Sequence, residues 1–170
     1  MDALKRSKAG FLRWQNKVKT KKDALEVGVP VVILLEHDEY DASFIGCTQD
    51  GRQFFLTTPF VPGAEGNEFV ALYTFDMKGN LIGHVIDELG PRSSLDMGLR
   101  EQIRLQRLKE LGNVSYCSIG IRPFLIERNG IVFGLIPHPP TTVEDGWTAS
   151  VEPGDYMSFS PPWDYGHYDT

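Results

Sequence analysis

The chain has 170 residues, of which 41% are hydrophobic and 24% charged, a composition typical of a globular protein and unlike that of a disordered one. Its length is about that of one domain. The longest apolar run, 29–35, ends at Glu36, well short of the roughly 18 residues that a membrane-spanning helix needs. The first residues also lack the apolar core of a secretion signal, so we expect a cytoplasmic protein whose cysteines, Cys47 and Cys117, are reduced.

The net charge of −6 is distributed unevenly along the chain. Residues 1–22 carry eight basic residues and one acidic residue, whereas residues 23–170 carry nine basic and twenty-two acidic residues. The body of the protein is therefore acidic and its N-terminal arm is basic.

The basic arm has the apolar spacing of an amphipathic helix. Its apolar residues fall at intervals of seven, with a tryptophan between two of them: Leu4, Phe11, Val18, Leu25 and Trp14. We predict a helix over residues 1–25 with these side chains on one face and the lysines on the other. Gly10 weakens such a helix by about 1 kcal/mol relative to alanine, so the helix needs a surface to lie on.

Strand patterns prevail from Val29 onward. Residues 30–36 form a first apolar run, and three hairpins are predicted over 43–58, 68–87 and 115–136. Each has a turn that contains glycine, which supplies the positive φ of a tight turn. The turns are Asp50-Gly51, Met77-Lys78-Gly79-Asn80 and Asn129-Gly130. Residues 147–151 are a further strand candidate.

The clearest helix pattern covers residues 93–111. Ser93 and Asp96 resemble a capping box, and Gly112 is placed to end the helix. The apolar stripe consists of Leu95, Leu99, Ile103, Leu108 and Leu111, and the expected solvent face carries Arg100, Arg104, Arg107, Glu101 and Glu110.

Together these patterns predict an α+β fold, an antiparallel sheet of hairpins with one long internal helix packed on a face and an N-terminal amphipathic helix. The predicted division is a basic helix over 1–25 and a single α+β domain over 26–170. This domain ends in an aromatic tail over 159–170, in which we expect Trp163 to be largely buried against the sheet.

Several stretches between residues 40 and 170 resemble the family of bacterial proteins named formate hydrogenlyase regulatory protein HycA. They are Phe44-Ile45-Gly46, Asp50-Gly51-Arg52-Gln53-Phe54, Leu72-Tyr73-Thr74-Phe75-Asp76, Gly79-Asn80, Ile119-Gly120-Ile121-Arg122-Pro123-Phe124, Phe133-Gly134-Leu135, Pro162-Trp163-Asp164 and Tyr168-Asp169-Thr170. The resemblance implies a common fold and a regulatory role in a hydrogenlyase regulon. It does not extend to the basic arm.

Three sets of side chains are weighed as chemical sites. The acidic run 36–41 could hold Ca²⁺ or Mg²⁺, but its composition is more typical of a solvated loop. Asp164, His167 and Asp169 in the tail are a candidate metal site for a small hydrolase-like enzyme. The cysteines lack a neighbouring histidine in sequence and are interpreted as structural. No phosphate-binding glycine loop or nucleophile elbow is present, and no cofactor is expected.

The basic arm is the main candidate for partner binding. The residues predicted to bind are Lys5, Arg6, Arg13, Trp14, Lys17 and Lys21. The leading hypothesis is a non-enzymatic regulatory domain that binds another protein or a second copy of itself, and the arm could equally dock on its own acidic body. A regulator that contacts DNA through this helix is the alternative, although an acidic chain of pI near 5.2 repels a duplex around a small footprint.

Overall fold

The computed structural model describes residues 3–19 and 28–170. The chain divides into two compact units, a central unit over residues 35–121 and a terminal unit built from residues 1–34 and 122–170. Among the described residues, each unit contains an antiparallel sheet and an α-helix, so the predicted α+β fold is confirmed. In the described part of the chain, no helix is both long enough and apolar enough to cross a membrane.

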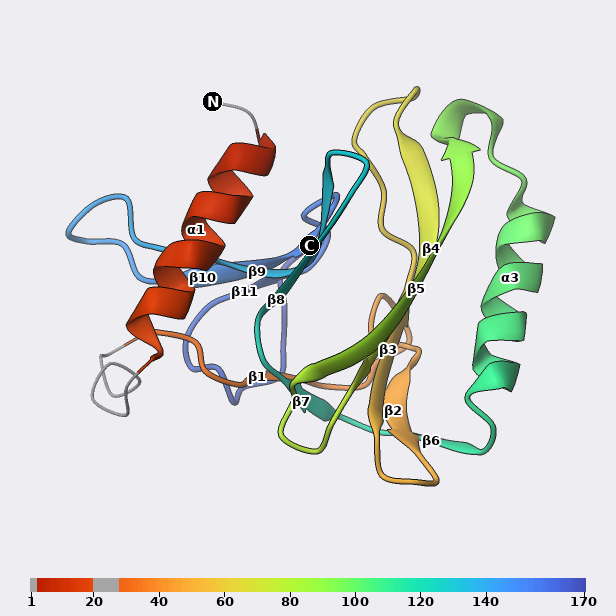
Figure 1. Cartoon of the computed structure of the whole chain (residues 1–170), viewed down its shortest axis with the longest axis horizontal. Coiled ribbons are helices and arrows are strands. Elements are labelled where there is room, and N and C mark those ends of the chain that lie inside the picture. Colours follow the sequence, from red (N-terminus) through yellow and green to blue (C-terminus); the bar gives the residue numbers. More distant parts are fainter. Residues whose placement is uncertain (1–2, 20–27) are drawn as a thin grey trace. The chain divides into compact units, whose positions relative to one another are not determined.

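The central unit is built on a five-stranded antiparallel sheet of order β5-β4-β3-β2-β6 (Figure 1). The strands are β2 (Ile45–Thr48), β3 (Gln53–Thr57), β4 (Asn67–Phe75), β5 (Leu81–Pro91) and β6 (Val114–Tyr116), and the short β7 (Ile119–Ile121) follows. The first two predicted hairpins are confirmed, with φ of +85° at Gly51 and +84° at Gly79 in their turns.

The internal helix α3 (Met97–Glu110) packs on this sheet, as predicted. Ile103, Leu108 and Leu111 pack against an apolar cluster on the sheet that consists of Phe54, Leu56, Val70 and Leu72. The helix ends before Gly112, whose φ of +77° suits the glycine that follows a helix.

The predicted start of this helix is wrong by a few residues. A short 3₁₀ turn, η1 (Arg92–Ser94), comes first, and Asp96 alone caps α3 by accepting a hydrogen bond from the Leu99 amide at 3.0 Å. The Ser93 hydroxyl instead donates to Glu65 at 3.3 Å. An aspartate is a strong N-cap by itself, so the second residue of a capping box is not needed.

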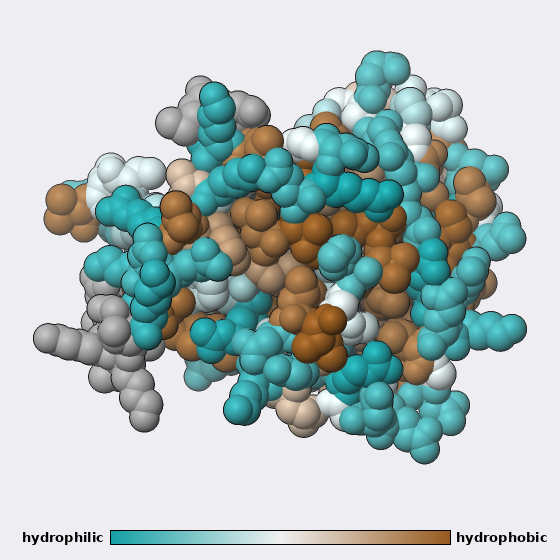
Figure 2. All heavy atoms as spheres, viewed as in Figure 1, coloured by the Kyte–Doolittle hydropathy of each residue, from teal (hydrophilic) through white to brown (hydrophobic). Residues whose placement is uncertain are grey.

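The predicted faces of α3 are also partly wrong. Arg100 and Arg107 point toward the sheet and pair with Glu68 and Asp87, at 2.6 and 2.7 Å. Leu99, by contrast, is 42% exposed, and apolar atoms reach the surface over α3 (Figure 2). The reason is that the sheet presents carboxylates to the helix, so long arginine side chains are stabilised where the pattern predicted solvent.

The terminal unit contains a four-stranded antiparallel sheet of order β11-β10-β9-β8. Its strands are β8 (Phe124–Arg128), β9 (Ile131–His138), β10 (Thr148–Glu152) and β11 (Ser158–Phe159). The Asn129-Gly130 turn is confirmed, with φ of +51° and +75°. The strand predicted over 115–127 is divided into β6, β7 and β8. Pro123, which cannot donate to a ladder, lies at the break between β7 and β8. The predicted strand 30–36 shortens to β1 (Ile33–Leu35).

The N-terminal helix α1 (Ala3–Lys17) lies on β9 of the terminal unit (Figure 1). The two segments are so close at Gly10 that a Cβ there would lie 3.0 Å from the Pro137 carbonyl oxygen. Gly10, which weakens the helix in isolation, therefore allows it to dock. The part of the prediction beyond residue 19, including Lys21 and Leu25, lies outside the described residues.

Candidate functional site

The buried face of α1 is apolar and belongs to the core of the terminal unit. Trp14, Val29 and Trp147 form a buried cluster, against which Phe11, Val18 and Trp163 pack. Trp14 is only 5% exposed, and its indole Nε1–H donates to the Pro30 carbonyl oxygen at 2.6 Å. The helix α1, which was predicted to need a surface, therefore packs on the terminal unit to which it belongs. Trp14, predicted to bind a partner, is therefore committed to the interior.

The cations of α1 lie on the remaining surface of the helix. Lys5, Arg6 and Arg13 are exposed, while Lys17 is half-buried. Lys8 forms an ion pair with Glu127 of β8. Arg6 and Arg13 are seven residues apart, close to two helical turns, so they follow one side of the helix. The structure thus separates the predicted set into a buried tryptophan and an exposed group of cations, Lys5, Arg6 and Arg13, which we call the α1 cation group.

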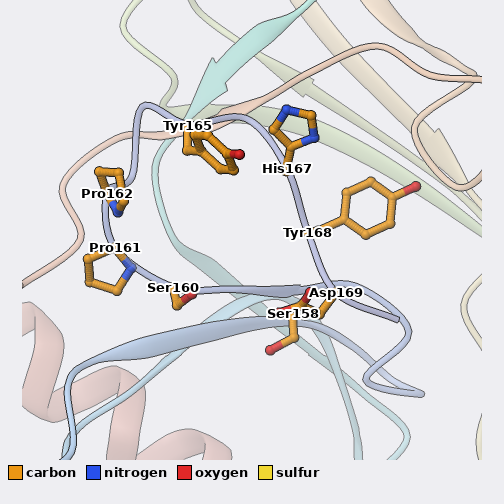
Figure 3. A pocket seen from close by; sticks show the side chains of 8 residues that line it. All are labelled: Ser158, Ser160, Pro161, Pro162, Tyr165, His167, Tyr168 and Asp169. Atoms are coloured by element: carbon orange, nitrogen blue, oxygen red, sulfur yellow. The ribbon is translucent and has the colours of Figure 1, made fainter.

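The tail contains a pocket of about 270 Å³ (Figure 3). Residues 158 and 169 pair as an antiparallel bridge, with N···O distances of 2.8 and 2.9 Å, and close the intervening chain into a loop. The rings of Tyr165 and His167 lie next to each other, with centroids 4.6 Å apart. The lining consists of Ser158, Ser160, Pro161, Pro162, Tyr165, His167, Tyr168 and Asp169.

The pocket brings together only part of the predicted metal site. His167 and Asp169 line it, and Asp164 is not part of its lining. Within residues 3–19 and 28–170, no three His, Cys, Asp or Glu side chains gather into a group that could hold a metal ion. The pocket instead offers aromatic rings and hydroxyl groups, which suit stacking and hydrogen bonding to a small molecule.

The predicted burial of Trp163 is only partial. The side chain is half-buried, and it packs against the buried cluster to which α1 contributes Trp14. Its Nε1–H donates to the Gly28 carbonyl oxygen at 3.2 Å, and its own carbonyl accepts from the Leu34 amide at 2.8 Å. These bonds tie the tail to β1 and to the segment that precedes it, so Trp163 has a structural role.

A polar chain of three side chains lies across β9 and β10 and was not found from the sequence. His138 Nε2 lies 2.7 Å from the Ser150 hydroxyl, which donates to Glu152 at 2.9 Å. Burial lowers the pKa of His138 and raises that of Glu152. The Ser150 hydroxyl thus lies within hydrogen-bond distance of both the imidazole and the carboxyl group. These contacts connect the neighbouring strands β9 and β10 within the terminal unit.

The acidic run 36–41 forms a loop in which a carboxylate accepts hydrogen bonds from nearby main-chain amides. Asp38 Oδ1 accepts hydrogen bonds from the amides of Tyr40 and Ala42, at 2.8 and 3.0 Å. The carboxylate therefore stabilises a turn, which agrees with the predicted loop.

Comparisons of the chain with protein-family models, with curated proteins and with solved structures find no match, so the resemblance to the HycA family stays a prediction.

Proposed function

We propose that the protein is a non-catalytic regulatory domain that binds an acidic segment of another protein through the α1 cation group. The observation that carries the proposal is the way in which α1 is held. Trp14 and the close approach at Gly10 fix the helix on its own sheet, while Lys5, Arg6 and Arg13 remain exposed. Charges on a fixed helix are positioned before a partner arrives, which lowers the entropic cost of binding.

The distribution of charge favours a protein segment over nucleic acid. The terminal unit carries ten basic and ten acidic residues, while the central unit carries seven and thirteen. A helix of 15 residues is about 22 Å long, so a short acidic segment can lie within its length. A DNA duplex extends beyond that length in both directions, and neither the terminal unit, with equal numbers of acidic and basic residues, nor the chain, with its net charge of −6, offers the excess of basic residues that phosphates need.

The proposal is tested by fluorescence anisotropy with a labelled peptide rich in glutamate and aspartate. The variant Arg6→Glu/Arg13→Glu reverses two charges of the α1 cation group. The matched control Lys78→Glu/Lys109→Glu reverses two exposed charges of the central unit and changes the net charge equally. We expect the wild type and the control to bind the peptide, more weakly as salt increases, and the α1 variant to lose most of the binding.

Several outcomes contradict the proposal. One is equal loss of binding in both charge-reversed variants, since this would reflect net charge alone. Another is a failure of the wild type to bind the peptide at low salt. Tighter binding of a duplex DNA of similar length, lost in the same α1 variant, would support the DNA-contacting alternative. Melting temperatures of the variants verify that they remain folded.

A further inference from the structure

Cys47 and Cys117 come together on one face of the central sheet. Strands β2 and β6 pair antiparallel, with Gly46 opposite Tyr116. Cys47 follows Gly46 within β2, and Cys117 follows Tyr116 directly after the end of β6, so the two side chains project from the same face and lie diagonally across the ladder. The two sulfur atoms are 3.6 Å apart, and the Cys117 thiol donates to Cys47. Both cysteines are free and half-exposed.

We propose that Cys47 and Cys117 form an oxidation site, which a peroxide converts into an intramolecular disulfide. The sulfur atoms are in contact and need a further approach of about 1.5 Å to reach the bond length of a disulfide. The half-exposure of both residues gives a small oxidant access, in contrast to a buried structural cysteine. The reduced pair predicted from the sequence is the resting form.

The neighbouring contacts hold the two thiols in place from both sides. At Gly46 the strands approach so closely that a Cβ would lie 2.0 Å from the Ser115 carbonyl oxygen. After Cys117, the chain is held by Gln53, whose amide group donates to the Gly120 carbonyl and accepts from the Gly120 amide, both at 2.9 Å. Gln53 lies opposite Cys47 in the β2–β3 ladder, so its side chain ties the segment after Cys117 to the strands that hold Cys47.

The reaction balances with hydrogen peroxide as the oxidant. A cysteine thiolate attacks one peroxide oxygen, the O–O bond breaks, and the released hydroxide takes a proton to give water and a sulfenic acid. The second cysteine then attacks the sulfenic sulfur. The S–O bond breaks, the leaving hydroxide takes the thiol proton, and a second water forms. The two thiols together lose two electrons, and one molecule of peroxide accepts them.

Intact mass spectrometry of the full chain after exposure to hydrogen peroxide tests this site. We expect the monomer to lose the mass of two hydrogen atoms, and both cysteines to become resistant to iodoacetamide until dithiothreitol is added. In Cys47→Ser and in Cys117→Ser the remaining cysteine has no partner. Each variant is therefore expected to gain oxygen, or to form a dimer that dithiothreitol reverses.

A second measurement uses stability and does not depend on the variants. A disulfide between residues 47 and 117 closes a long loop that contains α3, so the oxidised protein should unfold at a higher urea concentration than the reduced protein. The proposal is overturned if the wild type gains oxygen at each cysteine without a link, if it links only between two molecules, or if oxidation lowers the urea midpoint.

Discussion

Trp14 donates its indole N–H to the main-chain oxygen of Pro30, 2.6 Å away and 16 residues further along the chain. The bond joins α1 to the segment that leads into β1. It also satisfies the one polar atom of a side chain that is otherwise surrounded by Val29 and Trp147. The tryptophan is therefore held in one position by both packing and a hydrogen bond.

Replacing Trp14 by alanine should destabilise the protein by about 3–5 kcal/mol, because it leaves a cavity in the core of the terminal unit. The matched control is Leu12→Ala on the same helix, since Leu12 is 58% exposed. This control should change stability by less than about 0.5 kcal/mol. Urea midpoints measure both effects. Equal midpoints for Trp14→Ala and the wild type would show that α1 is not part of the folded core.

Replacing Arg100 by methionine should cost up to about 3–5 kcal/mol. The buried Glu68 carboxylate would lose its close partner and keep only Arg92, whose Nε lies 4.0 Å from Glu68 Oε2. Glu68 is only 8% exposed, and its Oε1 lies 2.6 Å from the Arg100 guanidinium. The double variant Glu68→Leu/Arg100→Met should recover much of the loss, since it removes the buried charge as well. Glu101→Gln is the control, because that carboxylate is 47% exposed. If Arg100→Met is as mild as Glu101→Gln, the pair does not attach α3.

Asp96→Ala should lower stability by about 0.5–2 kcal/mol, as expected for the loss of an N-cap. Ser93→Ala should have a smaller effect, since the Ser93 hydroxyl donates to Glu65 and does not cap α3. Circular dichroism during thermal unfolding compares the two variants at equal concentration. The reverse order would place the start of the helix at Ser93, where the sequence pattern had put it.

His138 should make the wild type less stable in mild acid. Burial lowers the pKa of His138 in the folded protein below the ordinary value of 6.5. Well above pH 6.5 the histidine is neutral in both the folded and the unfolded protein, so its full contribution to the free energy of unfolding is present. As the pH falls from 6.5 through the lowered pKa, the unfolded chain takes up the proton first, so stability is lost.

The variant His138→Gln isolates this effect, since it keeps a donor for Ser150 but cannot take up a proton. The comparison with a variant is needed because burial raises the pKa of Glu152, which stabilises the folded state as the pH falls and opposes His138. Urea midpoints measured from pH 7.5 down to about 5 should fall further for the wild type than for His138→Gln. The control His84→Gln, at an exposed position, should follow the wild type. Parallel curves for all three proteins would refute the assignment.

The parts of the fold that were predicted correctly depend on neighbours in sequence. Asn129-Gly130 and Asp50-Gly51 specify their turns through their own main-chain preferences, and Gly112 ends α3 in the same way. The apolar spacing of the N-terminal arm likewise needs only the helical period. Such signals are local, so a single sequence contains them in full.

The contacts that the sequence did not reveal depend on strand register. Arg100 and Arg107 appear solvent-facing until the register of β4 and β5 places Glu68 and Asp87 beneath them. The same holds for the candidate site. The helix pattern places Trp14 on the apolar face, but it does not show which part of the chain covers that face, so Trp14 stays a candidate for partner binding until the structure places Val29 and Trp147 against it.

Because α1 rests on β9, the terminal unit has consequences for the order in which the chain folds during synthesis. Residues 3–17 leave the ribosome first, whereas their docking strand begins at Ile131. The central unit is continuous in sequence, so it can fold while the apolar face of α1 is still uncovered. A newly made chain therefore displays Trp14 beside a basic surface until β9 has been translated as well.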